Sequence, residues 1–165
     1  MPTPAPDHAR RALLLAAALG LAGCAALPPP ADYPLLWAGR LALQIASDPP
    51  QSFNAAFELR GAPQAGELRL YSPLGSTLAE LRWAAGRAEL LARGELRLYD
   101  SIDALTEDAT GTSLPLAALF AWLDGRPADV PGWQADLSRI ADGRLSARRD
   151  MPLPPAELRV VLQQP

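Results

Sequence analysis

The sequence contains no lysine, and its only histidine and only cysteine, His8 and Cys24, lie near the N-terminus. The rest of the chain therefore cannot build the Ser-His or Cys-His pair of a nucleophilic enzyme, or the nitrogen and thiolate ligands of a zinc site. The absence of lysine excludes a P-loop and a Schiff base, so neither nucleotide hydrolysis nor a cofactor is expected. A single cysteine also excludes an internal disulfide.

Carboxylates are the only acid or base candidates that remain. They are spread over expected helix ends and turns, where a solvated surface role is the usual one. No two of them suggest the paired carboxylates of a glycosidase, so we expect no enzyme, and a carboxylate-based hydrolase is the alternative. The candidates are Asp100, Asp103, Glu107, Asp108, Asp124, Asp129 and Asp136.

The N-terminus has the layout of a secretory signal. Arg10 and Arg11 precede an unbroken apolar run over residues 12–22, about half the length that a membrane-spanning helix needs. The following Leu-Ala-Gly-Cys sequence, which ends at Cys24, resembles a bacterial lipobox. That resemblance implies that residues 1–23 are removed and that Cys24 is acylated as the first mature residue. The alternative is that Cys24 is a small buried core residue.

The remaining 142 residues, 24–165, fit a single domain. Without Arg10, Arg11 and Asp7 they contain 13 arginines and 17 carboxylates, a net charge of −4. This acidic balance and the lack of a basic cluster make nucleic acid an unexpected partner. Successive prolines over residues 24–36 predict an extended tether, which would hold a domain over residues 37–165 beside a membrane.

Apolar and polar residues alternate over most of the domain, which predicts half-buried strands. Breaks rich in proline and glycine separate the runs, as in a meander. We therefore expect a mainly β fold with one curved antiparallel sheet. The expected strands are 37–45, 53–60, 67–71, 77–83, 87–92, 95–99, 133–140, 144–148 and 157–162.

Two short helices are expected between the sixth and seventh strands. In the first, Asp100 or Ser101 is the expected N-cap and Gly111 the expected end. In the second, Ser113 is the expected N-cap and Gly125 the expected end. The second helix is apolar almost all the way round, which predicts either an ordinary core helix or one that shields an apolar space.

The hairpin sequence Ser-Pro-Leu-Gly over residues 72–75 contains one unusual residue. Pro73 and Gly75 suit a type I turn, but a leucine at the third position has little to pack on. Either Leu74 folds back onto a neighbour, or it enters something apolar such as a bilayer or the groove of a partner.

Several of these features together resemble the LolB family of outer-membrane lipoprotein receptors. They are the lipobox, Gly-Arg-Leu-Ala-Leu over residues 39–43, Ser-Pro-Leu-Gly at a hairpin tip, and Trp-Leu-Asp-Gly-Arg-Pro over residues 122–127. Trp133 and Leu153-Pro154 extend the resemblance over nearly the whole mature chain.

The resemblance implies that the curved sheet forms an open half-barrel, with the two short helices covering its mouth. It also implies an apolar cavity that accepts the acyl chains of lipoproteins from the soluble periplasmic carrier LolA. It also implies a lipid anchor at Cys24 on the periplasmic face of the outer membrane, and a membrane-insertion loop at Pro73, Leu74 and Gly75. We expect a monomer and no metal; the alternative function is a structural or assembly lipoprotein. The candidate cavity residues are Leu41, Leu43, Phe53, Phe57, Leu68, Leu70, Leu81, Trp83, Leu119, Phe120, Trp122 and Leu123.

Overall fold

The computed structural model describes residues 33–110 and 113–163. The predicted signal segment, Cys24 and most of the predicted tether lie outside these residues. The strands are β1 (Leu35–Ile45), β2 (Gln51–Ala62), β3 (Ala65–Tyr71), β4 (Thr77–Ala84), β5 (Arg87–Ala92), β6 (Glu95–Tyr99), β7 (Trp133–Asp136), β8 (Arg144–Arg149) and β9 (Ala156–Leu162). The helices are α2 (Ile102–Thr110), α3 (Leu116–Leu123) and the 3-10 turn η3 (Ile140–Asp142).

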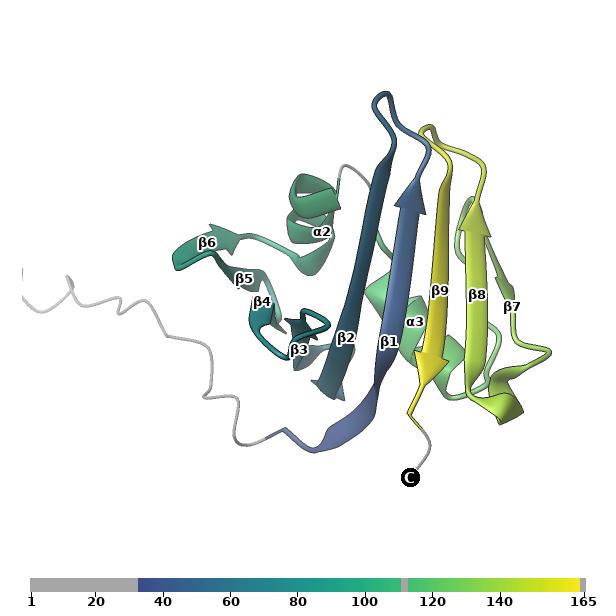
Figure 1. The fold of residues 1–165 in the computed structure, drawn as a ribbon, viewed down its shortest axis with the longest axis horizontal. Coiled ribbons are helices and arrows are strands. Elements are labelled where there is room, and N and C mark those ends of the chain that lie inside the picture. The colour runs from purple at the N-terminus through teal and green to yellow at the C-terminus, as the bar shows by residue number, and fades with distance from the viewer. Residues whose placement is uncertain (1–32, 111–112, 164–165) are drawn as a thin grey trace, which may run out of the picture.

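All nine strands belong to one antiparallel sheet, in the order β6-β5-β4-β3-β2-β1-β9-β8-β7 (Figure 1). The order ends at β6 and β7, so the sheet is curved but does not close into a barrel. The first six strands follow one another as a meander, whereas the last three lie on the other side of β1. This architecture confirms the predicted mainly β fold with an open half-barrel.

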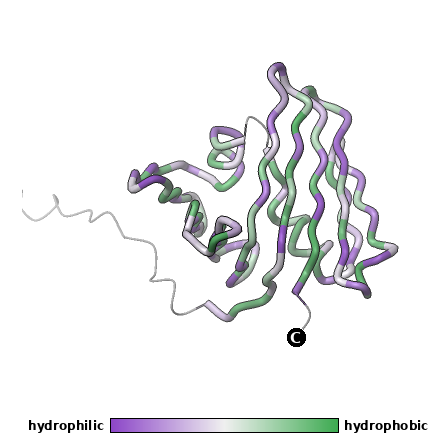
Figure 2. The backbone as a smooth tube through the Cα atoms, in the orientation of Figure 1, coloured by the Kyte–Doolittle hydropathy of each residue, from purple (hydrophilic) through white to green (hydrophobic). Residues whose placement is uncertain are grey.

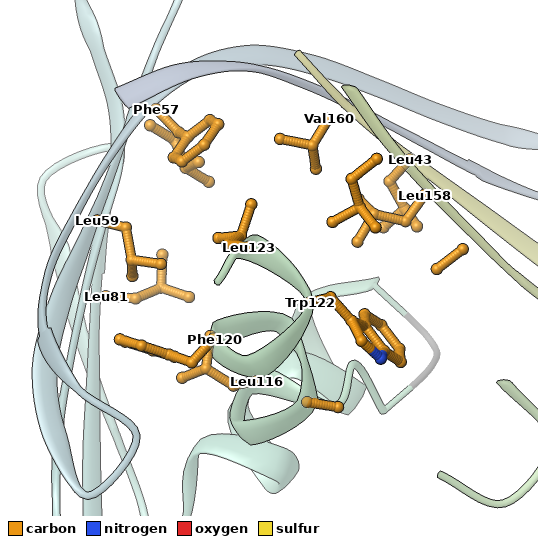
Figure 3. Close-up of a cluster of buried hydrophobic side chains, with 14 of the residues drawn as sticks. Leu43, Phe57, Leu59, Leu81, Leu116, Phe120, Trp122, Leu123, Leu158 and Val160 are labelled. Atoms are coloured by element: carbon orange, nitrogen blue, oxygen red, sulfur yellow. The ribbon is translucent and has the colours of Figure 1, made fainter. Parts of the chain in front are cut away.

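Alternation along the strands explains why the sheet has one apolar face. In β1, Leu43 and Ile45 are buried while Gln44 between them is exposed. In β9, Leu158 and Val160 are buried while Arg159 between them is exposed. Figure 2 shows this alternation as changes between hydrophobic and hydrophilic colours along the strands. The two helices lie on the concave side of the sheet (Figure 1), and buried strand residues such as Leu43, Leu158 and Val160 lie on the side of α3 (Figure 3).

The first helix is capped as expected. Ser101 Oγ accepts a hydrogen bond from the backbone N–H of Ala104 at 3.1 Å, which is the usual N-cap interaction. The helix packs against β5 and β6, and Leu105 is fully buried there. The expected C-terminal residue, Gly111, lies outside the described residues.

The second helix begins differently from the prediction. Pro115 takes the N-cap position without a side-chain cap, so the expected role of Ser113 is wrong. Proline needs no partner for an N–H that it lacks, and its carbonyl accepts from Leu119 at 2.9 Å. At the other end Gly125 has a φ of +71°, and the N–H of Arg126 donates to Ala121 O at 2.8 Å. This left-handed ending confirms the predicted end of the helix.

Most predicted strand ends lie within two residues of the observed ones, and two of the differences matter for the architecture. β1 begins at Leu35, so two residues assigned to the tether belong to the sheet. The strand predicted over residues 133–140 ends at Asp136, because the Asp136 carboxylate accepts a hydrogen bond from the backbone N–H of Ser138 at 2.9 Å and turns the chain. No helix among the described residues is long and apolar enough to span a membrane.

Candidate functional site

The candidate site is the space between the concave face of the sheet and α3 (Figure 3). Cross-strand register brings the predicted residues to this face: Phe57 lies opposite Leu70, and Leu68 lies opposite Leu81. Leu43 of β1 lies opposite Phe53 at the start of β2. The predicted residues that are buried are Leu43, Phe57, Leu70, Leu81, Trp83, Phe120, Trp122 and Leu123.

The other four predicted residues are less enclosed. Leu41, Leu68 and Leu119 are half-buried and pack against the core. Phe53 is 38% exposed, because β2 extends beyond the helices at this end. Phe53 therefore lies at the rim of the apolar face and not inside it.

Aromatic contacts hold α3 against the sheet. The Phe120 ring meets the rings of Trp37 on β1 and Trp83 on β4 edge-on, with centroids 5.6 and 6.2 Å apart. The indole N–H of Trp83 donates to Ala62 O at 3.1 Å, and that of Trp122 donates to Ala128 O at 3.4 Å. Because backbone carbonyls satisfy both indoles, these rings present an apolar surface to the interior.

Several interior residues were not predicted as part of the site. Leu59 on β2 and Leu105 on α2 are fully buried, and Leu158 and Val160 on β9 complete the wall beside β1. Alternation with the polar residues Glu157 and Arg159 was a sufficient signal that the β9 pair is buried. The position of β9 next to β1 carried no comparable signal.

The interior is occupied by these side chains. Two hollows among the described residues lie on the outer face of the sheet, and the larger of the two has a volume of about 420 Å³. Its lining residues include Gln44, Arg148, Asp150 and Glu157. The acyl-chain role of the interior residues therefore stays a prediction, and it requires that α3 give way to a ligand.

One cation enters the inner face. Arg149 of β8 is 5% exposed, with its guanidinium over the Trp133 ring at 5.7 Å from the centroid. Its Nη2 donates to Pro154 O at 2.9 Å, which ties β8 to the loop that precedes β9. Burial lowers the pKa of Arg149. The burial of Arg149 was not predicted, because the two arginines at positions 148 and 149 look equally solvated in the sequence.

A cluster of charged residues lies on the outer face of β2 to β5. Glu67 is fully buried among arginines there, in contact with Arg69 and directly opposite Arg82. Burial raises the pKa of Glu67, and the positive charge of Arg69 opposes that shift. Arg69 also lies 3.6 Å from Glu80. These ion pairs keep charge away from the apolar interior.

The carboxylates considered as acid or base candidates do not form a cleft. All seven are exposed: Asp103, Glu107 and Asp108 lie on α2, and the other four lie in turns, in loops or at a strand end. Asp108 accepts a hydrogen bond from Tyr99 Oη at 2.6 Å, and Asp124 pairs with Arg126 at 3.0 Å. Among the described residues, no group of histidine, cysteine, aspartate or glutamate side chains is arranged to hold a metal.

Leu74 projects from the turn between β3 and β4. The turn is closed by hydrogen bonds from Ser72 N to Ser76 O at 2.8 Å and from Gly75 N to Ser72 O at 2.9 Å. Gly75 has a φ of +82°, which a residue with a side chain rarely adopts. Leu74 is 95% exposed, so it does not fold back onto a neighbour.

Comparison with known proteins decides the family. Residues 36–157 match the family model described as outer membrane lipoprotein LolB. The chain belongs to the LolB family. It is 37% identical to the outer-membrane lipoprotein LolB of Chromobacterium violaceum over 145 residues, which cover 82% of this chain and 77% of the relative. It is 33% identical to LolB of Bordetella petrii over 174 residues, covering 88% and 87%. LolB proteins take part in lipoprotein localisation and are not enzymes, so this chain is not an enzyme.

Proposed function

We propose that this protein receives lipoproteins from the soluble periplasmic carrier LolA and inserts them into the outer membrane. The observation that carries the proposal is the pairing of two features in one LolB-family domain. An almost wholly apolar helix, α3, covers the concave face of the sheet, and Leu74 is 95% exposed at a hairpin tip. The first feature suits the shelter of acyl chains, and the second suits entry into a bilayer.

Shelter is needed because lipoprotein acyl chains cost about 0.8 kcal/mol per CH₂ to expose to water. A carrier cannot release such cargo into solvent, so the chains must pass from one apolar surface to another. We expect them to take the positions that side chains of α3 hold on the concave face, among them Phe120 and Leu123. Direction would come from an affinity difference between donor and acceptor.

Delivery is the role that we assign to Leu74. Transfer of a leucine side chain from water into an apolar phase is worth roughly 1.5 to 3 kcal/mol. Pro73 and Gly75 hold the turn that presents the side chain. Because Leu74 is exposed in the folded domain, this free energy is still available for contact with a bilayer. A single exposed leucine is a weak membrane contact, so the lipid anchor proposed at Cys24 has to keep the domain near the bilayer.

The experiment is a two-step transfer assay with purified, acylated protein. Cargo-loaded LolA is incubated with the protein, and cargo on the protein is measured by co-purification; liposomes are then added, and cargo in the liposomes is measured by flotation. Leu74→Glu should still accept cargo but fail to deposit it. Leu153→Glu is the matched control, because Leu153 is also exposed, at 70%, on a different loop. Deposition by Leu74→Glu at the native level would remove Leu74 from the mechanism.

The anchor needs a separate test. Mass spectrometry of the mature protein should show a chain that begins at residue 24 and carries acyl groups on Cys24. Fractionation should then find it with the outer membrane. A mature chain that begins elsewhere, or an unmodified Cys24, would contradict the proposed attachment.

The occupied interior favours one alternative, a structural or assembly lipoprotein that acts through protein contacts. Such a protein would share the anchor and the sheet but would need no acyl site. The first step of the transfer assay separates the two functions. A protein that takes no cargo from loaded LolA would support the alternative.

A further inference from the structure

The outer face of β4, β5 and β6 carries four leucines that the core does not use. Their exposed fractions are 38% for Leu78, 44% for Leu91, and 60% for both Leu96 and Leu98. Leu91 lies directly opposite Leu96, and Leu98 follows on the same face of β6. Glu80 is the residue of β4 directly opposite Leu91. Leu78 lies two residues before Glu80 on the same face of β4, so it is the diagonal neighbour of Leu91. Residues at these spacings contact one another, so the four form one continuous surface, here called the leucine corner.

The leucine corner lies at the same end of the sheet as Leu74. The turn that carries Leu74 joins β3 to β4, and the next turn at this end joins β5 to β6. The two turns are neighbours because Ala79, near the start of β4, is paired with Ala92, at the end of β5. The tip of one hairpin and the outer face of the next therefore form one apolar region.

An unusual arginine borders this region. Arg93 and Gly94 form the two-residue turn between β5 and β6, with φ values of 54° and 79°. Such turns favour asparagine or glycine at the first position, since a larger side chain is strained in the left-handed region. Arg93 is exposed and makes no ion pair with any part of the chain that the structure describes. Arg93 therefore has a strained backbone conformation, and its guanidinium, two residues from Leu91, has no ion-pair partner among the described residues.

We propose that the leucine corner and Arg93 dock the domain on the phospholipid surface to which the chain is anchored. The leucines enter the headgroup layer, and the Arg93 guanidinium binds a lipid phosphate, for which its paired donors are well suited. This inference rests on the membrane anchorage in the proposed function and not on cargo transfer. It adds a second contact to the turn of Leu74 and fixes the orientation of the sheet relative to the bilayer.

The composition of the surface favours lipid over a protein partner. Energetically dominant residues in protein interfaces are mainly tryptophan, tyrosine and arginine, whereas leucine is under-represented among them. The leucine corner has no aromatic residue, and Arg93 lies at its border. A fluid acyl layer needs only aliphatic side chains with a cation at headgroup height. The remaining outer face, from β2 to β5, carries ion pairs such as Arg60–Glu58 at 3.1 Å and does not suit a bilayer.

The test compares a fluorophore at two positions on the outer face, one inside the leucine corner and one away from it on β9. In the acylated protein the thiol of Cys24 is consumed, so Leu96→Cys provides a single labelling site. Val161→Cys on β9 is the matched control, because Val161 is apolar, lies on the outer face and is 49% exposed. Each labelled protein is reconstituted into vesicles of phosphatidylethanolamine and phosphatidylglycerol with brominated acyl chains, without carrier or cargo.

We expect the label at residue 96 to be quenched several-fold more than the label at residue 161, with a blue-shifted emission. Adding Arg93→Gln to Leu96→Cys should lower that quenching. Equal quenching at the two positions would overturn the inference. A blue shift that appears only when LolA is added, without quenching by brominated lipid, would assign the surface to the carrier and overturn it too. Because no cargo is present, failure here leaves the transfer assay unaffected, and failure of transfer leaves this result unaffected.

Discussion

The rings of Trp37 and Phe120 meet edge to face with centroids 5.6 Å apart, and this contact joins β1 to α3. Trp83 meets the same ring from β4, so one phenylalanine bridges two strands that are not neighbours. The position of α3 over the concave face therefore depends on Phe120 more than on any hydrogen-bonded cap, since Pro115 makes none with a side chain.

Phe120→Ala should lower the free energy of unfolding by about 3–5 kcal/mol, because it removes a buried ring and both aromatic contacts. Urea denaturation followed by tryptophan fluorescence measures the loss. Leu74→Ala serves as the control and should change stability by no more than about 0.5 kcal/mol, because Leu74 contacts little in the folded domain. A loss at residue 120 as small as that of the control would mean that α3 is not held by this ring.

Leu59→Ala should raise the affinity of the domain for a fluorescent fatty acid. Leu59 is fully buried on the inner face of β2, and its truncation leaves room beside α3 at a cost of about 2–5 kcal/mol in stability. If acyl chains enter this interior, less of the native packing has to be displaced. Val161→Ala on the outer face, away from the leucine corner, should leave the affinity unchanged. Equal affinities for the native protein and both variants would place the acyl site outside the interior.

Gly39→Ala should destabilise the junction of β1 and β9. A Cβ at this position would lie 2.2 Å from the carbonyl oxygen of Val161, so one of the two strands has to shift. We expect a loss of about 1–3 kcal/mol and a lower Tm in thermal unfolding. Arg40→Ala, the exposed neighbour, should stay within about 0.5 kcal/mol of the native protein. An unchanged Tm for Gly39→Ala would show that the β1–β9 ladder adapts easily.

Glu67→Gln should gain stability relative to the native protein as the pH rises. Burial raises the pKa of Glu67 above its ordinary value of 4.5, so the folded state binds this proton more tightly than the unfolded state. The contribution of Glu67 to stability is therefore fully present below pH 4.5 and is lost as the pH rises through the raised pKa. Urea unfolding at about pH 4 and about pH 8 measures the change. A difference that moves the other way would mean that attraction to Arg69 outweighs burial.

The sequence predicts the strands well because alternation is a local signal. All nine expected strands exist, and most of their ends lie within two residues of the expected positions. The strand expected to continue to Ile140 was wrong because the side chain of Asp136 turns the backbone, which hydropathy does not reveal. The cap expected at Ser113 was wrong because Pro115 begins the helix by itself.

Contacts between residues that are far apart in the sequence were harder to predict. The pairing of β9 with β1 joins residues more than a hundred positions apart, such as Leu43 and Leu158, and no local pattern specifies it. For the same reason the β9 part of the inner face was missed. The exposure of Leu74 was one of two interpretations of the sequence, and only the fold shows that nothing nearby covers it.

The two ends of the sheet have a mechanical consequence. Among the described strands, β6 and β7 do not pair with each other, so the curvature can open or tighten without breaking a backbone ladder. A closed barrel has a circumference set by its strand number and stagger, whereas this sheet has no such constraint. The volume on the concave side of the sheet can therefore change with the size of the molecule that it encloses.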